Sequence, residues 1–325
     1  MSSTGECPHG VLFVNLGSPS APTASAVRRF LEEFLSDPLV VDLPRLRWWL
    51  LRRLVILPLR APRSARAYRA IWTAQGAPLL VHSQRFAAAL GRELGAGYRV
   101  AVGMRYGSPS IADGLAELAR AGCERVLLFP AFPQQSRTTT GTVALEAGRA
   151  SKHVRSAPVP SALAPYFADP GYVGALAARI REARGAKDVD HFVFSFHGLP
   201  VRLVAAGDPY RGHCEATARA LARALDLADE RWTLVYQSRF GREPWLEPDA
   251  ARAVPELARK HRRVLLATPG FVCDCLETLE ELGLRLCSAF LAAGGAELVL
   301  VPCLNDHPAW VRAAAALVRS RCEGP

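Results

Sequence analysis

The chain has 325 residues, half of them hydrophobic, and a formal net charge of +10. This length suffices for one large or two medium α/β domains, and the apolar content excludes a disordered chain. The positive charge is compatible with nucleic acid, an anionic membrane or an acidic small molecule, but nucleic acid is disfavoured because zinc-finger spacing, an aromatic RNA-binding strand and a basic tail are all missing from the sequence.

The first half of the chain alternates apolar strand patterns with helical spacing. Strands are predicted at residues 10–16, 98–106 and 125–129, and helices at 24–35, 83–94, 111–121 and 141–150. Residues 39–59 form an apolar stretch that Pro44, Pro58 and several arginines interrupt. This alternation is typical of parallel α/β architecture.

The second half repeats the same alternation. Strands are predicted at 191–196, 232–237, 263–268 and 296–301, and helices at 171–183, 214–225, 274–292 and 307–319. Prolines 158, 160 and 165 indicate a linker within 155–170. We therefore predict an N-terminal lobe at 1–160 and a C-terminal lobe at 161–325, with a cleft between them and a last helix able to pack back on the first lobe.

Several absences narrow the function. Residues 1–10 lack the charged start and apolar run of a signal peptide, and we find no charge-free run of about 20 apolar residues that could span a membrane. We therefore expect a cytoplasmic protein whose eight cysteines are thiols rather than disulfides. The sequence also lacks a G-x-G-x-x-G after a strand, a P-loop, an H-E-x-x-H and a G-x-S-x-G, which disfavours hydride and phosphoryl transfer.

His197 is the first candidate for chemistry. It follows a predicted strand and precedes Gly-Leu-Pro. Ligands of open α/β sheets bind at the carboxyl ends of strands, and a neutral imidazole can accept a proton or bind a metal. The alternative is a histidine that only caps a turn.

An acidic row is the second candidate. Asp274, Glu277 and Glu281 have the i, i+3, i+7 spacing of one helix face, where three carboxylates could bind a cation or pass protons. The alternative is a capping box, with Asp274 as N-cap and Glu277 at N3. Capping does not explain Glu281, which lies beyond the first turn.

Two loops after predicted strands carry side chains suited to an acidic ligand. Arg105 can hold an acidic group, and Tyr106 can stack on a flat one. Residues 133–141 offer Ser136, threonine hydroxyls and a helix N-terminus, which suit an anion. A threonine-rich N-cap explains this second loop equally well.

Residues 39–69 contain eight arginines and one acid, Asp42, beside apolar residues that include Trp48 and Trp49. Arginine and tryptophan beside an apolar face favour a segment that lies on an anionic membrane. An ordinary surface helix with one buried face is the alternative.

The cysteines at 273, 275, 287 and 303 permit a metal site, but a single C-x-C is a weak signal because zinc sites usually show paired C-x(2–4)-C spacings. Buried thiols are the favoured interpretation, since cysteine is among the most buried residue types.

Many ordered segments resemble the ferrochelatase family, most of all its proteobacterial-type members, over nearly the whole length. They are VNLG at 14–17, FLSD at 34–37, VDLP at 41–44, RY at 105–106, PQQS at 133–136, SFHGLP at 195–200, GDPY at 207–210, YQSRFGREPW at 236–245, PGF at 269–271, LETLEE at 276–281 and PCLN at 302–305.

The resemblance implies two Rossmann-like lobes with parallel sheets flanked by helices and an active-site cleft between them. It implies a lyase that inserts Fe²⁺ into protoporphyrin IX, with release of two protons, to give protohaem. The catalytic residues would be His197 and Glu277. The metal would meet His197, Glu277, Glu281 and Asp274, and the porphyrin would meet Leu16, Arg105, Tyr106, Ser136 and Trp245. A membrane-facing lip at about 39–75 would make peripheral contact with the inner membrane.

The resemblance requires no cofactor, since Fe²⁺ is a substrate. A [2Fe–2S] cluster is disfavoured because Arg137 occupies the cysteine position of the animal-type pattern and only Cys322 lies near the C-terminus. Three alternatives stay open. The first is coproporphyrin III as substrate, and the second is a chelatase for another tetrapyrrole such as sirohydrochlorin. The third is a non-catalytic carrier, which would lack the base or the acidic row.

Overall fold

The structure, a computed structural model, describes residues 9–41, 44–241 and 243–322. Asp42, Leu43 and Arg242, which belong to motifs that carry the resemblance, lie outside the described residues, as do residues 1–8, where a signal peptide is not expected. The chain divides into two compact units. Unit 1 comprises Met1–Ala131, Arg137–Ala164 and Ala314–Pro325, and unit 2 comprises Phe132–Ser136 and Pro165–Ala313.

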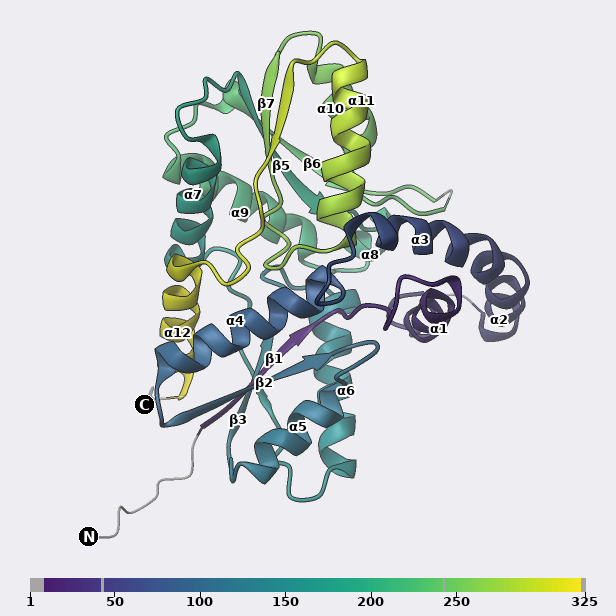
Figure 1. Cartoon of the computed structure of the whole chain (residues 1–325), viewed down its shortest axis with the longest axis vertical. Coiled ribbons are helices and arrows are strands. Elements are labelled where there is room, and N and C mark those ends of the chain that lie inside the picture. Colours follow the sequence, from purple (N-terminus) through teal and green to yellow (C-terminus); the bar gives the residue numbers. More distant parts are fainter. Residues whose placement is uncertain (1–8, 42–43, 242, 323–325) are drawn as a thin grey trace. The chain divides into compact units, whose positions relative to one another are not determined.

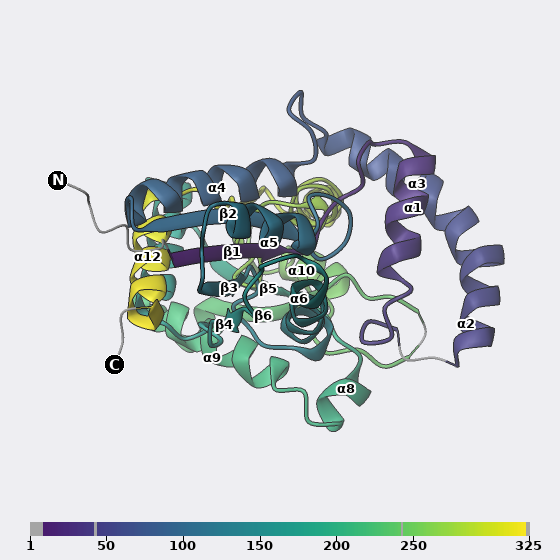
Figure 2. The same cartoon turned by 90° about the horizontal axis from the view of Figure 1, so that it is seen from below.

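Unit 1 contains a parallel sheet with the strand order β2-β1-β3-β4. Its strands are β1 (His9–Asn15), β2 (Tyr98–Met104), β3 (Val126–Pro130) and β4 (Ser161–Ala162). Figure 2 shows them in this order, with α4 (Pro78–Leu94) alongside β2. The first three strands were predicted. The short β4 lies where the sequence indicated only a linker, and it pairs with β3 through Leu127 and Ser161.

Helices cover both faces of this sheet (Figure 1). A Cβ built on Gly91 of α4 would lie 3.7 Å from Val100 Cγ2, and one built on Gly103 would lie 3.1 Å from the Cα of Ile111, the first residue of α5 (Ile111–Arg120). Residues 100 and 103 of β2 point to opposite faces because side chains alternate along a strand. The remaining helices of this unit's first two segments are α1 (Ala24–Phe34), α2 (Arg45–Leu51), η1 (Arg52–Ile56), α3 (Leu57–Ile71), η2 (Arg137–Gly141) and α6 (Thr142–His153).

The core of unit 1 contains a cluster of three aromatic rings. Phe13 lies 4.7 Å from Phe86 and 5.7 Å from Phe129, measured between ring centroids. All three side chains are fully buried. One comes from β1, one from α4 and one from β3, so the cluster fastens a helix to two neighbouring strands.

The apolar stretch at 39–59 is helical where the structure describes it from Arg45 on, although the sequence indicated that Pro44 and Pro58 would interrupt it. Helix α2 begins after Pro44, continues through the π-helical segment η1 and passes directly into α3. Pro58 and Pro62 therefore lie within one helical run, and Pro58 directly follows the π-helical segment, where the regular hydrogen-bond ladder is already altered. In the described part of the chain, none of the helices is long and apolar enough to cross a bilayer.

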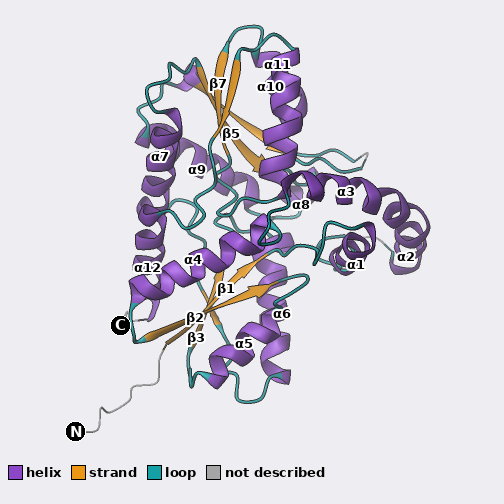
Figure 3. Cartoon of the chain, in the orientation of Figure 1, coloured by secondary structure: helices purple, strands orange, loops and turns teal. Residues whose placement is uncertain are grey.

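Unit 2 contains a second parallel sheet, with the order β6-β5-β7-β8; its strands β5 and β7 are labelled in Figure 3. Its strands are β5 (His191–His197), β6 (Trp232–Gln237), β7 (Arg263–Ala267) and β8 (Glu297–Leu300). All four were predicted, and each predicted boundary agrees with the structure or differs from it by a single residue. Two four-stranded parallel sheets flanked by helices confirm the predicted fold class.

The helices of unit 2 include two that were not predicted, α8 (Val201–Ala205) and α10 (Ala250–Leu257). The others are α7 (Pro170–Arg184), α9 (Tyr210–Ala224), η3 (Asp229–Arg231), η4 (Glu277–Leu286) and α11 (Cys287–Ala292), and α12 (Pro308–Cys322) begins in this unit. Val254 of α10, together with Leu286 and Phe290, packs on Val193 and Val235 of the sheet in one buried cluster. This apolar surface holds the helix that carries the acidic row.

His191, at the start of β5, provides a pH-dependent contribution to stability. Its side chain is buried, hydrogen-bonds to Thr233 Oγ1 at 2.8 Å, and stacks on His261 with centroids 4.5 Å apart. Burial and, to a smaller extent, the charges of His261 and Arg231 together lower the pKa of His191 to about 4. The native state therefore favours the neutral ring.

Because the folded pKa lies below the unfolded value of about 6.5, this stability is complete above pH 6.5 and is lost as the pH falls toward 4. We expect urea denaturation to show a loss on the order of 2 kcal/mol over this interval. In His191→Gln the loss should be clearly smaller, whereas His153→Gln, which changes an exposed histidine, should leave it unchanged. An equally steep loss in His191→Gln would contradict the assignment.

Candidate active site

The carboxyl ends of β5 and β6 bring the site of unit 2 together. His197 is the last residue of β5 and pairs in register with Gln237, the last residue of β6. Parallel strands present these ends at one edge of the sheet, where α/β proteins bind ligands. The sequence placed His197 at a strand end, and the structure confirms that position.

The half-buried His197 has a defined tautomer. Its Nδ1 lies 2.7 Å from the carbonyl oxygen of Gly198, which can only accept a hydrogen bond. Nδ1 therefore carries the proton in the neutral ring, and Nε2 has the available lone pair. A neutral imidazole in this tautomer can accept a proton or ligate a metal through Nε2.

Glu277 and Glu281 lie on the π-helical segment η4. The Glu281 carboxylate accepts two hydrogen bonds from Ser238, one from the backbone N–H at 2.8 Å and one from the hydroxyl at 2.6 Å. Burial raises the pKa of Glu281 and the charge of Glu277 adds to the rise, while the Ser238 hydrogen bonds and His197 oppose it. Glu277 and His197 are therefore close enough to the Glu281 carboxylate to influence its protonation.

Asp274 has a different environment from the other two acids. It is buried, and its carboxylate accepts hydrogen bonds from Asn305 Nδ2 at 2.7 Å, Cys303 N at 3.2 Å and Thr278 Oγ1 at 3.1 Å. It is not the N-cap that the capping box required, because the helical turns begin later, with Leu276 at the N-cap position and no side-chain cap. Instead, Asp274 fastens the segment before η4 to the loop after β8.

The residues that the structure describes contain no group of three or more histidine, cysteine, aspartate or glutamate side chains arranged to hold a metal ion. The described cysteines carry thiols rather than disulfides. Burial raises the pKa values of Cys275 and Cys303 well above the ordinary value, and the nearby Glu277 and Asp274 respectively raise them further. Both side chains are thus neutral thiols near pH 7, as the sequence predicted for buried cysteines.

Trp245 packs against the residue that follows the histidine. Its ring packs against Gly198, where an added Cβ would come within 3.1 Å of Trp245 Cε3, and its backbone pairs with Pro200. The indole Nε1 is buried and has no hydrogen-bond partner among the described residues. A larger residue at 198 would crowd the Trp245 ring and the Gln237 carbonyl oxygen, which would lie 3.0 Å from an added Cβ, so close packing explains the glycine after His197.

Arg105 and Tyr106 in unit 1 are held by protein partners. The Arg105 guanidinium pairs with Asp37, donates to Thr142 Oγ1 at 2.6 Å and lies 4.4 Å over the Tyr106 ring, while the Tyr106 hydroxyl donates to Asp37 at 2.9 Å. Burial alone would raise the pKa of Asp37, but the hydrogen bonds and the charge of Arg105 outweigh it and hold that pKa below its usual value. In this structure Arg105 and Tyr106 therefore stabilise the backbone that follows β2.

Leu16, at the same strand end, is half-buried, and its carbonyl accepts the Tyr106 N–H at 2.9 Å. The next residue must be glycine, because Gly17 has φ +110° and an added Cβ would lie only 1.8 Å from the Tyr106 carbonyl oxygen. The glycine of the motif at 14–17 is thus explained by the close approach of its backbone to that of Tyr106.

Ser136 belongs to a short segment of unit 2 that α9 and the loop before it hold in place. It is buried and donates to Asp208 Oδ2 at 2.9 Å. The neighbouring Gln134 side chain donates to Thr217, and the Gln135 backbone N–H donates to His213 Nδ1 at 3.1 Å. The carboxylate partner of Ser136 is a feature that the anion-site hypothesis for this loop did not include.

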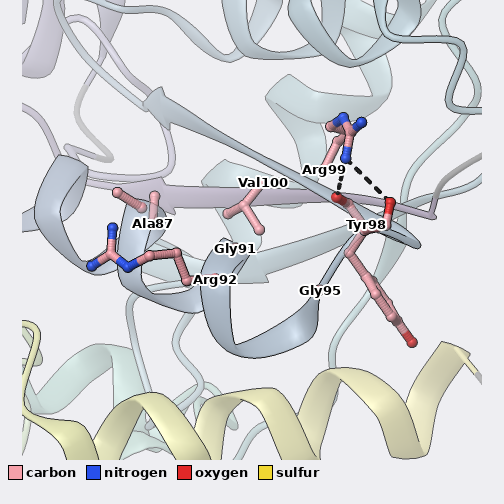
Figure 4. A pocket seen from close by; sticks show the side chains of 9 residues that line it. Ala87, Gly91, Arg92, Gly95, Tyr98, Arg99 and Val100 are labelled. Atoms are coloured by element: carbon pink, nitrogen blue, oxygen red, sulfur yellow. Dashed lines mark hydrogen bonds between the residues drawn. The ribbon is translucent and has the colours of Figure 1, made fainter.

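Unit 1 also has a surface hollow of about 480 Å³ between α4 and the start of β2 (Figure 4). Ala87, Gly91 and Val100 form part of its wall, and Arg92 and Arg99 lie at it. Arg99 Nη1 donates to the carbonyls of Ala96 and Tyr98. None of the predicted site residues lines this hollow.

Two residues at the site of unit 2 escaped the sequence analysis, Gln237 and Ser238. Both lie within a segment that carries the resemblance, but neither has an obvious chemical role. Their signal was positional, since Gln237 ends the strand that pairs with the strand ending in His197, and Ser238 comes next.

Comparison with known proteins agrees with this geometry. The model of the ferrochelatase family matches residues 8–322. The chain is 47% identical over 319 residues to a ferrochelatase of Aromatoleum aromaticum, covering 96% of this chain and 87% of the relative. It is 46% identical over 316 residues to one of an Azoarcus species, with the same coverage, and 42% identical over 321 residues to one of Chromobacterium violaceum, covering 97% and 88%.

Solved structures share the fold at low sequence identity. SirB from Bacillus subtilis with Fe³⁺ matches with a TM-score of 0.54 and 12% identity, covering 96% of this chain and 95% of that one. CbiX, described as the terminal enzyme of sirohaem biosynthesis in denitrifying bacteria, matches with a TM-score of 0.53 and 15% identity, covering 96% and 98%. These likenesses support the architecture, and the family match over nearly the whole sequence shows that the chain belongs to the ferrochelatase family.

Proposed function

We propose that this chain inserts Fe²⁺ into protoporphyrin IX and releases two protons to give protohaem. His197, Glu277 and Glu281 at the carboxyl edge of the sheet in unit 2 are the observation that carries the proposal. The sequence similarity to ferrochelatases of 42–47% identity supports the reaction class, which is that of a lyase.

The chemistry requires groups that accept protons near neutral pH. A free-base porphyrin carries two pyrrole N–H protons, and both must leave as the metal enters, so the charge of the macrocycle falls by two while Fe²⁺ adds two. His197 Nε2 is available to take one proton, because Nδ1–H is committed to Gly198. The pair Glu277 and Glu281 can take a proton or guide the cation, because burial and mutual repulsion raise the pKa of Glu281.

The remaining predicted residues take supporting roles in this proposal. Asp274 orients the start of η4 through Thr278 and Asn305, so its effect on the metal is indirect. Trp245, whose ring packs against Gly198 next to the histidine in sequence, offers an apolar surface for contact with the porphyrin. For Leu16, Arg105, Tyr106 and Ser136 we propose that the three polar side chains fix local backbone through the contacts described and that Leu16 contributes an apolar contact.

An anaerobic insertion assay tests the proposal. Purified protein is mixed with Fe²⁺ or Zn²⁺ and with protoporphyrin IX or coproporphyrin III, and the Soret shift is recorded. We expect turnover with protoporphyrin IX. Faster turnover with coproporphyrin III would identify that porphyrin as the substrate instead. Porphyrin binding without insertion of either metal would favour a non-catalytic carrier, and a visible chromophore before substrate is added would reveal an iron–sulfur cluster.

A second part of the proposal concerns the helical segment of unit 1 from α2 to α3, which we expect to make peripheral contact with the cytoplasmic face of the inner membrane. Seven large apolar side chains are exposed on it: Leu46, Trp49, Leu50, Leu51, Leu54, Val55 and Leu59. Exposed arginines accompany them, and residues 44–71 contain no acid. Exposed apolar groups of this density, with cationic neighbours, suit a surface of anionic lipid.

Co-sedimentation with vesicles tests this contact. We expect binding to vesicles that contain phosphatidylglycerol and much weaker binding to neutral vesicles. Leu54→Glu, at a side chain 71% exposed, should weaken partitioning about tenfold or more, since it removes apolar burial and adds a negative charge. Val159→Glu, at a side chain 77% exposed elsewhere in unit 1, is the matched control and should bind normally. Equal binding of both variants would argue for an ordinary surface helix.

A further inference from the structure

Ser238 has an unusual backbone conformation for its residue type. It follows the last residue of β6 and has φ +64°, in the left-handed region that serine rarely occupies. Its backbone N–H and its hydroxyl both donate to the carboxylate of Glu281, to one oxygen each. Strained residues of this kind persist where the surrounding contacts fix them, and they cluster at functional sites.

Gln237, the preceding residue, connects the same carboxylate region to the histidine. Its side-chain Oε1 accepts from Ser195 Oγ at 2.8 Å, and its Nε2 donates to the Glu277 carbonyl at 3.3 Å. Its backbone carbonyl accepts the Gly198 N–H at 2.8 Å. The Gly198 carbonyl in turn accepts Nδ1–H of His197.

We propose that Gln237 and Ser238 are positioning residues that fix the base and the two glutamates relative to each other. This inference rests on the proposed function, which makes His197, Glu277 and Glu281 the reacting groups. Two adjacent residues reach all three: Gln237 holds the backbone of Glu277 and, through Gly198, the ring of His197, while Ser238 holds the carboxylate of Glu281. Because Gln237 is almost fully buried, its amide cannot exchange these partners for water.

The hydrogen bonds from Ser238 hold the Glu281 carboxylate near Glu277. Glu277 and Glu281 repel each other when both are charged, so an unrestrained Glu281 side chain would rotate away. Two charge-assisted hydrogen bonds from one residue hold it against that repulsion. Reacting groups need such support from neighbouring side chains, because loss of position costs rate more than it costs binding.

Replacement of Ser238 tests the inference in the anaerobic Fe²⁺ insertion assay. Ser238→Gly removes the hydroxyl but keeps the N–H donor and accepts the left-handed conformation. We expect kcat to fall by about 10- to 100-fold, as for loss of one hydrogen bond to a charged group, while the KM for protoporphyrin stays within about twofold. Ser238→Asn, which also tolerates this conformation and keeps a side-chain donor, should recover part of the rate.

Ser156→Gly is the matched control, because Ser156 is an exposed serine of unit 1 with φ +59°. It should leave kcat and KM unchanged. Wild-type kcat in Ser238→Gly would overturn the inference, as would a defect that Ser238→Ala shows and Ser238→Gly does not, since that pattern would place the effect in backbone strain alone.

A double-mutant cycle between Ser238→Gly and Glu281→Gln separates this inference from the proposed function. We expect the two changes to be coupled by about fivefold or more in the unfolding equilibrium constant. If the wild type does not insert metal, the proposed function fails whatever the cycle gives. Additive effects in the cycle would overturn the inference even in an active enzyme.

Discussion

Replacement of His197 by alanine is expected to reduce the rate of metal insertion by about 10²- to 10⁴-fold, the range for loss of a general base. The basis is geometric. Nδ1–H is committed to the Gly198 carbonyl, so Nε2 is the lone pair that this ring can offer to a pyrrole N–H. The ring is half-buried at a strand end, with the Phe271 ring 6.5 Å away between centroids.

Porphyrin binding by His197→Ala should persist, because the contacts of Trp245 with Gly198 do not involve the imidazole. Insertion is followed by the Soret shift, and binding by quenching of tryptophan fluorescence. His153→Ala, which changes an exposed histidine at the end of α6, is the control and should have normal turnover. Normal insertion by His197→Ala would contradict the assignment of the base.

The second large effect is expected for Glu277→Gln, which should lower kcat by about 10²-fold or more. The change keeps the size of the side chain and leaves untouched the backbone carbonyl that Gln237 holds. It removes one of the two carboxylate charges, and with it the contribution of Glu277 to the raised pKa of Glu281. Glu281 then becomes a weaker proton acceptor, and the cation meets one negative charge fewer.

Glu280→Gln is the control for this second prediction. Glu280 lies on the same π-helical segment and pairs at 2.9 Å with Arg285, whose side chain is 66% exposed, so solvent screens the pair from that side and it contributes little. We expect its variant to turn over normally. Both variants should unfold at the wild-type urea concentration. Marked destabilisation of Glu277→Gln would instead indicate that this glutamate supports the fold and not the reaction.

The acidic row illustrates what sequence periodicity can and cannot predict. The spacing of Glu277 and Glu281 put them on one helix face. In the structure the two carboxylates are close enough for the charge of Glu277 to raise the pKa of Glu281. The same spacing included Asp274, but the helical turns start at a later residue and Asp274 turns to Asn305 instead. Spacing arguments assume a regular α-helix, and this segment is π-helical, with a different number of residues per turn.

The membrane-facing stretch shows a similar limit. Prolines at 44 and 58 suggested interruptions, yet Pro44 precedes a helix and Pro58 lies within the continuous helical run from Arg45 to Ile71. Pro44 costs little because the first N–H groups of a helix have no partner, whereas Pro58 is accommodated directly after the π-helical segment, where the hydrogen-bond ladder changes. Where such a change of ladder occurs is decided by packing and not by the local sequence pattern.

By itself, the sequence determined the strand–helix alternation, the two parallel sheets, His197 at a strand end and the family. These follow from local apolar periodicity and from ordered motifs, which need no knowledge of distant contacts. The tertiary structure decided which polar side chains meet. Ser238 reaches Glu281, 43 residues further on, and Asp37 reaches Arg105 and Thr142, because strand register and helix packing bring them together. Such contacts leave no local periodicity, so only the folded chain reveals them.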